Sequence, residues 1–150
     1  MIVEVKSASV GWVDLIMSSG QYQHVPTPPY TPGLEYAGVV SWKGSAVGNH
    51  VEVGDAVIAD GALTGPRSLG AHRAWGGWAS WAVAPSEALL RIPGALSFDE
   101  GCNLLGHYET AYHCLIARAR LSAGEPVLHL GASGATGPAA VENAKPGGAT

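Results

Sequence analysis

A glycine-rich stretch near the end of the 150-residue chain, GASGATG, has the residue types and spacing of a turn that binds a dinucleotide. It follows the apolar run at residues 127–130, which predicts a buried strand, and it precedes residues 138–144, where an initial proline is typical of a helix start. In such a turn Gly134 would let the backbone approach a pyrophosphate, and Gly137 would let the helix pack closely. The predicted cofactor-binding residues are Gly131, Ala132, Gly134, Ala135, Thr136 and Gly137.

The glycine pattern alone leaves two interpretations open: a phosphate-binding turn, or a turn that only joins a strand to a helix. In the first, the backbone N–H groups of Ala135 and Thr136 would face the anion at the helix N-terminus. The strand before the turn and the helix after it favour this interpretation. The residue that would distinguish NADPH from NADH lies about 20 positions further on, at or beyond Thr150.

The elements before this turn read as a β-rich region. Alternating or apolar residues predict short strands at 2–6, 38–42, 55–59 and 78–84. Between the first two, four prolines in residues 26–32 exclude a helix and a central strand. Many short strands with Gly and Pro turns predict a small β-barrel or sandwich.

Three tryptophans, Trp75, Trp78 and Trp81, recur at three-residue spacing near the last predicted strand. They could form a flat platform for a quinone ring, but Gly76 and Gly77 exclude a long helix there. A strand whose alternate aromatic side chains pack into the barrel is the favoured interpretation.

The pattern changes after Pro93. Ser97 and Glu100 have capping-box spacing, which predicts a helix start, and apolar periodicity predicts a second helix at 110–119. The predicted organisation is therefore a β-rich domain at 1–93, connecting helices at 94–122, and the start of an α/β domain at 123–150.

Composition limits the partners and the compartment. A net charge of −4 without a basic run gives no footprint for nucleic acid or for an anionic membrane surface. Two cysteines without Cys-x-x-Cys spacing, and no signal-peptide pattern, favour a reduced, cytoplasmic protein.

Six blocks of sequence, in order, resemble the medium-chain dehydrogenase/reductase superfamily, and most closely its zinc-independent, zeta-crystallin-like quinone oxidoreductase branch. They are VEVKSASVGWVDLIMSSGQY, TPGLEYAGVV, VEVGDAVIA, WASWAVAPSEALLRIPGALSFDEG, GHYETAYHCL and VLHLGASGATGPAAVENAKPGGA. The resemblance implies a mixed α/β protein: a GroES-like β-barrel catalytic domain followed by the first strand, turn and helix of a Rossmann domain. It also implies that N-terminal strands and the rest of the nucleotide domain are missing, so that the chain is a fragment.

The resemblance also implies roles for single residues. Zinc-dependent relatives have a histidine ligand where this chain has Leu34, and their cysteine ligand falls within residues 9–14, which contain no cysteine; no metal is therefore expected. Tyr22 and Asp14 match positions that line the catalytic cleft, and Thr110 matches a threonine near the nicotinamide.

Purely structural roles for these residues are also open. Asp14 could satisfy backbone N–H groups, Tyr22 could be a partly buried aromatic, and Thr110 could bond its own helix. Glu35 is expected to be structural. Gly11 and Ile16 replace an Asn and a Tyr of many relatives, so specificity could differ.

The function that the resemblance implies is NADPH-dependent reduction of quinones or α,β-unsaturated carbonyls without zinc, in a possible homodimer. The alternatives are an enoyl reductase of the same superfamily and a truncated, non-catalytic GroES-like module. Because one strand cannot enclose a dinucleotide, this chain alone is expected to bind NADPH weakly or not at all.

Overall fold

The computed structural model describes residues 1–48 and 50–149. They form two compact units, Met1–Asn103 and Leu104–Thr150. Residues 94–103, expected among the connecting helices, lie within the first unit. No helix in the described part of the chain is long and apolar enough to span a bilayer.

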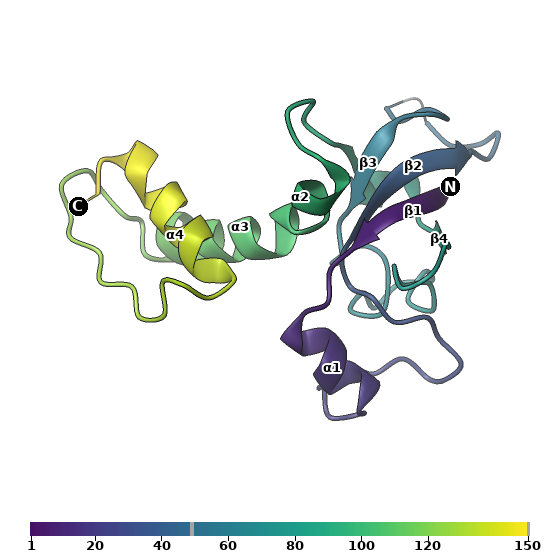
Figure 1. Cartoon of the computed structure of the whole chain (residues 1–150), viewed down its shortest axis with the longest axis horizontal. Helices are drawn as coiled ribbons and strands as arrows, with labels where there is room; N and C mark the ends of the chain where they lie inside the picture. Colours follow the sequence, from purple (N-terminus) through teal and green to yellow (C-terminus); the bar gives the residue numbers. More distant parts are fainter. Residues whose placement is uncertain (49, 150) are drawn as a thin grey trace. The chain divides into compact units, whose positions relative to one another are not determined.

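The first unit is built on a five-stranded antiparallel sheet with the order β4-β1-β2-β3-β5 (Figure 1). Three of its strands confirm the strands expected at 2–6, 38–42 and 55–59. The strands are β1 (Ile2–Ala8), β2 (Tyr36–Trp42), β3 (Ala56–Ala59), β4 (Trp81–Val83) and β5 (Leu89–Arg91).

Alternation along β1 and β2 produces the core of this unit. Val3 pairs with Val40 on one side and with Ala82 on the other, and all three side chains are buried. Tyr36 and Leu89 join the same cluster from β2 and β5. Each fully buried large apolar side chain contributes about 1.5–3 kcal/mol, so burial of this inner face stabilises the sheet.

The end of the proline-rich segment, residues 31–33, crosses the residues before β4, 75–78, and backbone contacts hold the two together at this crossing. Thr31 bridges Trp75 in parallel, and backbone N–H groups of Gly77 and Trp78 donate to the carbonyls of Gly33 and Pro32 at 2.9 Å each. The two backbones approach this closely because glycines occupy the crossing.

The strand expected at 78–84 is therefore shorter than predicted, since residues 75–78 pair with residues 31–33 instead. The expected packing of the tryptophans is wrong for two of them: Trp75 is 48% exposed and Trp81 54% exposed. Trp78 is half-buried, and its indole N–H donates to the Ser9 carbonyl at 2.9 Å.

Short helices complete the first unit: α1 (Trp12–Ser18), which no sequence pattern predicts, a 3₁₀ turn at Ser86–Ala88, and α2 (Phe98–Cys102). The predicted capping box at the start of α2 is confirmed. The Glu100 N–H donates to the Ser97 hydroxyl at 3.2 Å, and the Ser97 N–H donates to the Glu100 carboxylate at 2.8 Å.

The second unit is a pair of packed helices, α3 (Leu104–Tyr112) and α4 (Thr136–Ala144). The helix expected at 110–119 begins earlier, as α3, and ends in a π-helical turn at His113–Arg118; a 3₁₀ turn at Lys145–Gly147 follows α4. Ala111, Ala139 and Ala140 form the small core between the helices.

The strand expected at 127–130 is absent from the described elements of this unit. The segment is not assigned to a strand, and Leu128 and Leu130 are 87% and 85% exposed. A strand is defined by ladder bonds to a neighbour, and the sheet of the described residues does not include this segment.

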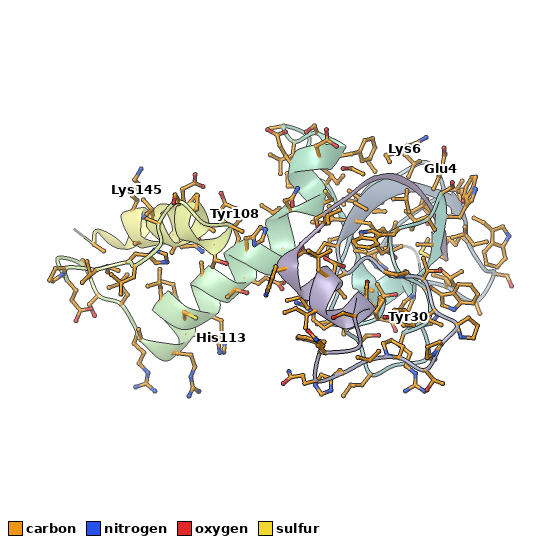
Figure 2. The ribbon with its side chains drawn as sticks, turned by 60° about the horizontal axis from the view of Figure 1, so that its bottom comes forward. Glu4, Lys6, Tyr30, Tyr108, His113 and Lys145 are labelled. Atoms are coloured by element: carbon orange, nitrogen blue, oxygen red, sulfur yellow. The ribbon has the colours of Figure 1, made fainter. Side chains whose placement is uncertain are left out.

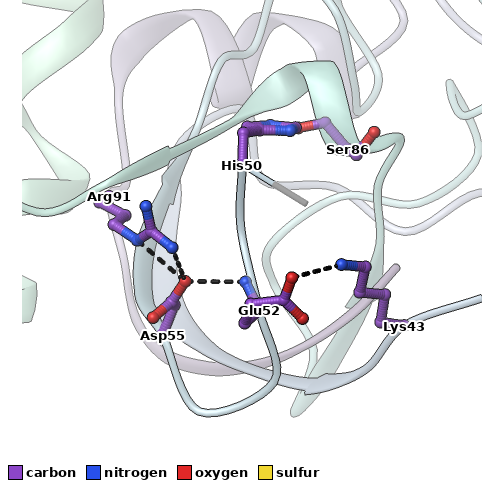
Figure 3. Close-up of polar contacts among 6 residues, drawn as sticks. All are labelled: Lys43, His50, Glu52, Asp55, Ser86 and Arg91. Carbon is purple, nitrogen blue, oxygen red and sulfur yellow. Dashed lines mark hydrogen bonds and ion pairs between the residues drawn. The ribbon is translucent and has the colours of Figure 1, made fainter. Parts of the chain in front are cut away.

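A polar cluster ties the turn before β3 to its surroundings (Figure 3). The Asp55 carboxylate accepts the Glu52 N–H at 2.7 Å and forms an ion pair with the Arg91 guanidinium at 2.7 Å. Lys43 pairs with the Glu52 carboxylate at 2.7 Å. The backbone N–H of Glu52, followed by Arg91, holds the pKa of Asp55 below its ordinary value of 3.8.

We expect Asp55→Asn to destabilise the chain at neutral pH and to matter little in acid. A carboxyl whose folded pKa is depressed contributes stability above its unfolded pKa and loses it as pH falls through the folded value. Urea unfolding at about pH 7 and about pH 2 should show the gap between wild type and variant closing. The matched Asp99→Asn, at an exposed carboxylate outside the ion pairs found in the described residues, should show no comparable closing.

Candidate functional site

The candidate residue Asp14 lies on α1 with its side chain only 3% exposed. One carboxylate oxygen accepts the Leu34 N–H and the other accepts the Gly11 N–H, each at 2.9 Å. The carboxylate thus closes the first turn of α1 and fastens the helix to the loop that follows the prolines. The sequence left two roles open for Asp14, one structural and one catalytic. The two bonds to backbone N–H groups are the structural role, and the catalytic role stays a prediction.

Next to this anchor, Leu34 is buried and Glu35 bonds to Ser9. The Ser9 hydroxyl donates to the Glu35 carboxylate at 3.0 Å, and the Ser9 N–H donates to the Glu35 carbonyl at 3.1 Å. No group of three or more His, Cys, Asp or Glu side chains suited to a metal occurs in the described ranges. The prediction of zinc-free chemistry still rests on residue type, since leucine offers no lone pair.

Tyr22, the second candidate catalytic residue, follows α1 and is half-buried. Its ring meets the ring of His24 edge-on, with centroids 6.2 Å apart and planes at 80°. The Tyr30 hydroxyl, in contrast, donates to the Met17 carbonyl at 3.3 Å; Figure 2 labels Tyr30. No residue in 1–48 or 50–149 bonds to the Tyr22 hydroxyl, so this phenol is available to a ligand.

The glycine-rich turn lies in the second unit and is held by its own backbone. Gly131 has a φ of +80°, which favours glycine, and its carbonyl accepts the Gly134 N–H at 3.0 Å. Gly137 is buried at the start of α4, where a Cβ atom would lie 2.3 Å from the Ala132 carbonyl oxygen. The sequence pattern predicts close packing of the helix at Gly137, and this packing is present: the start of α4 lies against the backbone of Ala132 in the turn.

The N-terminus of α4 fits an anionic group. Ala135 is the N-cap residue and supplies no side-chain acceptor, so the first N–H groups of the helix lack the capping bond that Ser or Asp would give. The turn residues from Gly131 to Ala135 are exposed. Free N–H groups and the positive end of the helix dipole suit a pyrophosphate.

Thr110, the third candidate, lies on α3 in the same unit as the turn. Its hydroxyl donates to the Gly106 carbonyl at 2.6 Å, so here it bonds its own helix. Beside it, the Tyr108 hydroxyl bonds to the Glu142 carboxylate, which raises the pKa of Tyr108, and the Asn143 amide donates to the Tyr108 carbonyl at 3.1 Å (Figure 2). These two contacts fix α3 against α4.

The candidate residues therefore fall into two sets. Asp14 and Tyr22 belong to the first unit, while Thr110 and the glycine-rich turn belong to the second. Their assignments to catalysis and to cofactor binding stay predictions.

Residues 1–94 match the family model of the alcohol dehydrogenase GroES-like domain. The chain belongs to this family. It is thus a member of the medium-chain dehydrogenase/reductase superfamily, as its sequence blocks predict.

This GroES-like chain is 35% identical, over 148 residues, to the quinone oxidoreductase of Lama guanicoe, a match that covers 97% of the chain and 40% of that protein. The quinone oxidoreductase of Thermus thermophilus, solved also with NADPH, is 30% identical with a TM-score of 0.75, covering 99% of this chain and 42% of that one. The CurK enoyl reductase is 28% identical with a TM-score of 0.79, covering 99% and 43%. The chain spans about two fifths of the length of the curated relatives it matches.

Proposed function

We propose that the whole protein is an NADPH-dependent oxidoreductase that reduces quinones or α,β-unsaturated carbonyls without zinc. The observation that carries this proposal is the turn at Gly131–Gly137. Gly137 packs against the turn so closely that no other residue fits, and the N-terminus of α4 that follows has no side-chain cap for its backbone N–H groups. The relatives named quinone oxidoreductase, including one solved with NADPH, support it.

In this proposal the residues of the chain hold the cofactor and move a proton. The N–H groups of Ala135 and Thr136 bind the pyrophosphate, and Gly137 lets the helix approach it. When bound, reduced nicotinamide supplies a hydride to the quinone or to the β-carbon of the enone. The free Tyr22 hydroxyl supplies the proton that completes the reduction, as a general acid, and Asp14 positions the helix that precedes it.

An enoyl reductase is the second candidate, favoured by the similarity to the CurK enoyl reductase. It would use the same hydride and proton transfers on an unsaturated acyl thioester. An assay of NADPH oxidation with two acceptors separates the two candidates: a quinone reductase should use a simple quinone, and an enoyl reductase should use a crotonyl thioester. Cytoplasmic location and a homodimer remain predictions beside this one.

The test is nucleotide oxidation by the protein at the full length that its gene encodes, with Ala135→Pro as the probe. Ala135 has φ −55°, which proline can adopt, so the variant removes one N–H at little conformational cost. A charge-assisted bond is worth about 1.5–3 kcal/mol, so the Kd for NADPH should rise about tenfold or more.

Ala135→Gly, which keeps the N–H and adds no side-chain acceptor, is the matched control and should bind NADPH as the wild type does. Unchanged affinity in Ala135→Pro would place the nucleotide elsewhere. A protein that binds NADPH but oxidises it with neither acceptor would favour the non-catalytic GroES-like interpretation.

A further inference from the structure

A hollow of about 250 Å³ lies within the first unit, between the segment after α1 and the long loop that precedes the crossing. Residues 23–26 form one wall, and Pro66, Ser68, Leu69 and Arg73 contribute to the other. Pro26 and Pro66 are buried and make a rigid apolar floor. Ligand pockets for drug-sized molecules occupy about 300–1,000 Å³, so this one suits a small group or one end of a larger molecule.

The charge at this hollow is unbalanced. Of the five Lys and Arg side chains of the first unit, three form ion pairs with carboxylates: Lys6 with Glu4, Lys43 with Glu52, and Arg91 with Asp55. The other two, Arg67 and Arg73, form none within the described part of the chain, and they lie in the same loop.

Arg73 lines the hollow together with the side chains of Gln23 and His24. All three can donate hydrogen bonds, and neither Gln23 nor His24 is bonded elsewhere among the described residues. The Ser68 hydroxyl, in contrast, already donates to the Gly65 carbonyl at 2.8 Å. No carboxylate lines the described walls.

From this arrangement we infer that the hollow binds the carboxylate of a small organic acid. The guanidinium of Arg73 matches a carboxylate with two parallel N–H bonds, and the Gln23 amide and the His24 imidazole add further donors. One fixed cation beside a proline floor suits a singly charged group with an apolar neighbour better than it suits a phosphate dianion, which carries more charge and no apolar part.

The position of the hollow gives it a consequence for the reaction. His24 lines it and meets the ring of Tyr22, the proton donor proposed above. If the proposed function holds, the substrate is a quinone or enone that carries a carboxylate substituent. Arg73 holds this carboxylate while the carbonyl of the substrate faces Tyr22.

The binding part is tested by titrating benzoate into the 150-residue chain and following its backbone amide NMR signals. We expect saturable shifts at residues 23–26 and 66–73 and binding at least tenfold weaker for neutral benzamide. Arg73→Gln should weaken benzoate binding at least tenfold, and Arg73→Lys by less. Arg118→Gln, which removes the same charge from the second unit, should leave it unchanged.

Three results would overturn the assignment: equal binding of benzoate and benzamide, equal binding by wild type and Arg73→Gln, or tighter binding of inorganic phosphate than of benzoate. If Arg73→Gln does not fold, the positions of the shifted signals in the wild type decide, because shifts confined to other segments contradict the hollow.

The substrate part is tested with 1,4-benzoquinone and its carboxylated derivative in the full-length protein. A kcat/KM at least tenfold higher for the carboxylated quinone, lost in Arg73→Gln, supports it. Equal turnover of both quinones overturns it while the proposed function stands. Turnover of neither quinone, nor of an enone with or without a carboxylate, while benzoate still binds, overturns the proposed function and the substrate class but leaves the carboxylate site.

Discussion

Gly33→Ala is expected to lower the free energy of unfolding of the first unit by about 2 to 6 kcal/mol. Gly33 has a φ of +99°, in the region that side-chain-bearing residues rarely adopt. A Cβ atom there would also lie 2.5 Å from the backbone nitrogen of Trp78, which itself bonds to Pro32. Backbone strain and overpacking each cost about 1–3 kcal/mol, and here they coincide.

Gly54→Ala separates these two costs. Gly54 has nearly the same φ, +93°, but no atom within 4 Å of its Cβ position. Urea unfolding of both variants should show a loss for Gly54→Ala that reflects strain alone, clearly smaller than the loss for Gly33→Ala. Equal losses would mean that the crossing yields to an added methyl group.

Asp14→Ala is the second large effect, an expected loss of about 3 to 6 kcal/mol, since each hydrogen bond to a charged group is worth about 1.5–3 kcal/mol. The variant leaves the buried N–H of Leu34 and the N–H of Gly11 without their acceptor. The start of α1 then loses its attachment to the loop at Gly33, and Tyr22 loses the helix that positions it.

Asp14→Asn keeps one acceptor oxygen and turns an amide group toward the other N–H, so it should lose about half as much. Asp99→Ala, at an exposed position, should change stability by less than about 0.5 kcal/mol. The measurement is urea unfolding followed by tryptophan fluorescence and circular dichroism. If Asp14→Ala kept full stability yet lost turnover in the full-length protein, Asp14 would act in the chemistry rather than in the fold.

The elements that the sequence predicts well are those whose signals are local. The alternation in β1, the capping box at Ser97 and the glycine-rich turn each depend on residues within a few positions of one another. Their physical causes, the two-residue strand period, a side-chain cap and the room left by glycine, act over the same short range.

The features that the sequence does not predict depend on distant partners. Trp75 is exposed in a segment whose backbone pairs with residues 31–33, some forty positions earlier, rather than with a strand. Trp81 lies in the edge strand β4 on the face opposite the buried Ala82. Residues 127–130 have a strand composition, but their ladder bonds need a neighbouring strand that the described residues do not supply. Helix α1 has glycine, Gly11, as its N-cap residue, and only Asp14 at its third position marks the start.

The carboxylate hollow was missed for the same reason. Gln23 and Arg73 are fifty positions apart, and neither stands in a recognisable motif. A signal was nevertheless present: Arg67 and Arg73 lie in a loop whose nearest acidic residue is Asp60, so the loop carries more positive charge than its surroundings neutralise.

The sheet order has a consequence for how the chain folds as it is made. β1 lies between β2 and β4 in the sheet, and β4 begins only at Trp81, so β1 must wait during synthesis for one of the last strands of the unit. Pairing between such distant segments must overcome the entropy of closing a long loop, which slows folding. We therefore expect the sheet to close only after nearly all of the first unit has been translated.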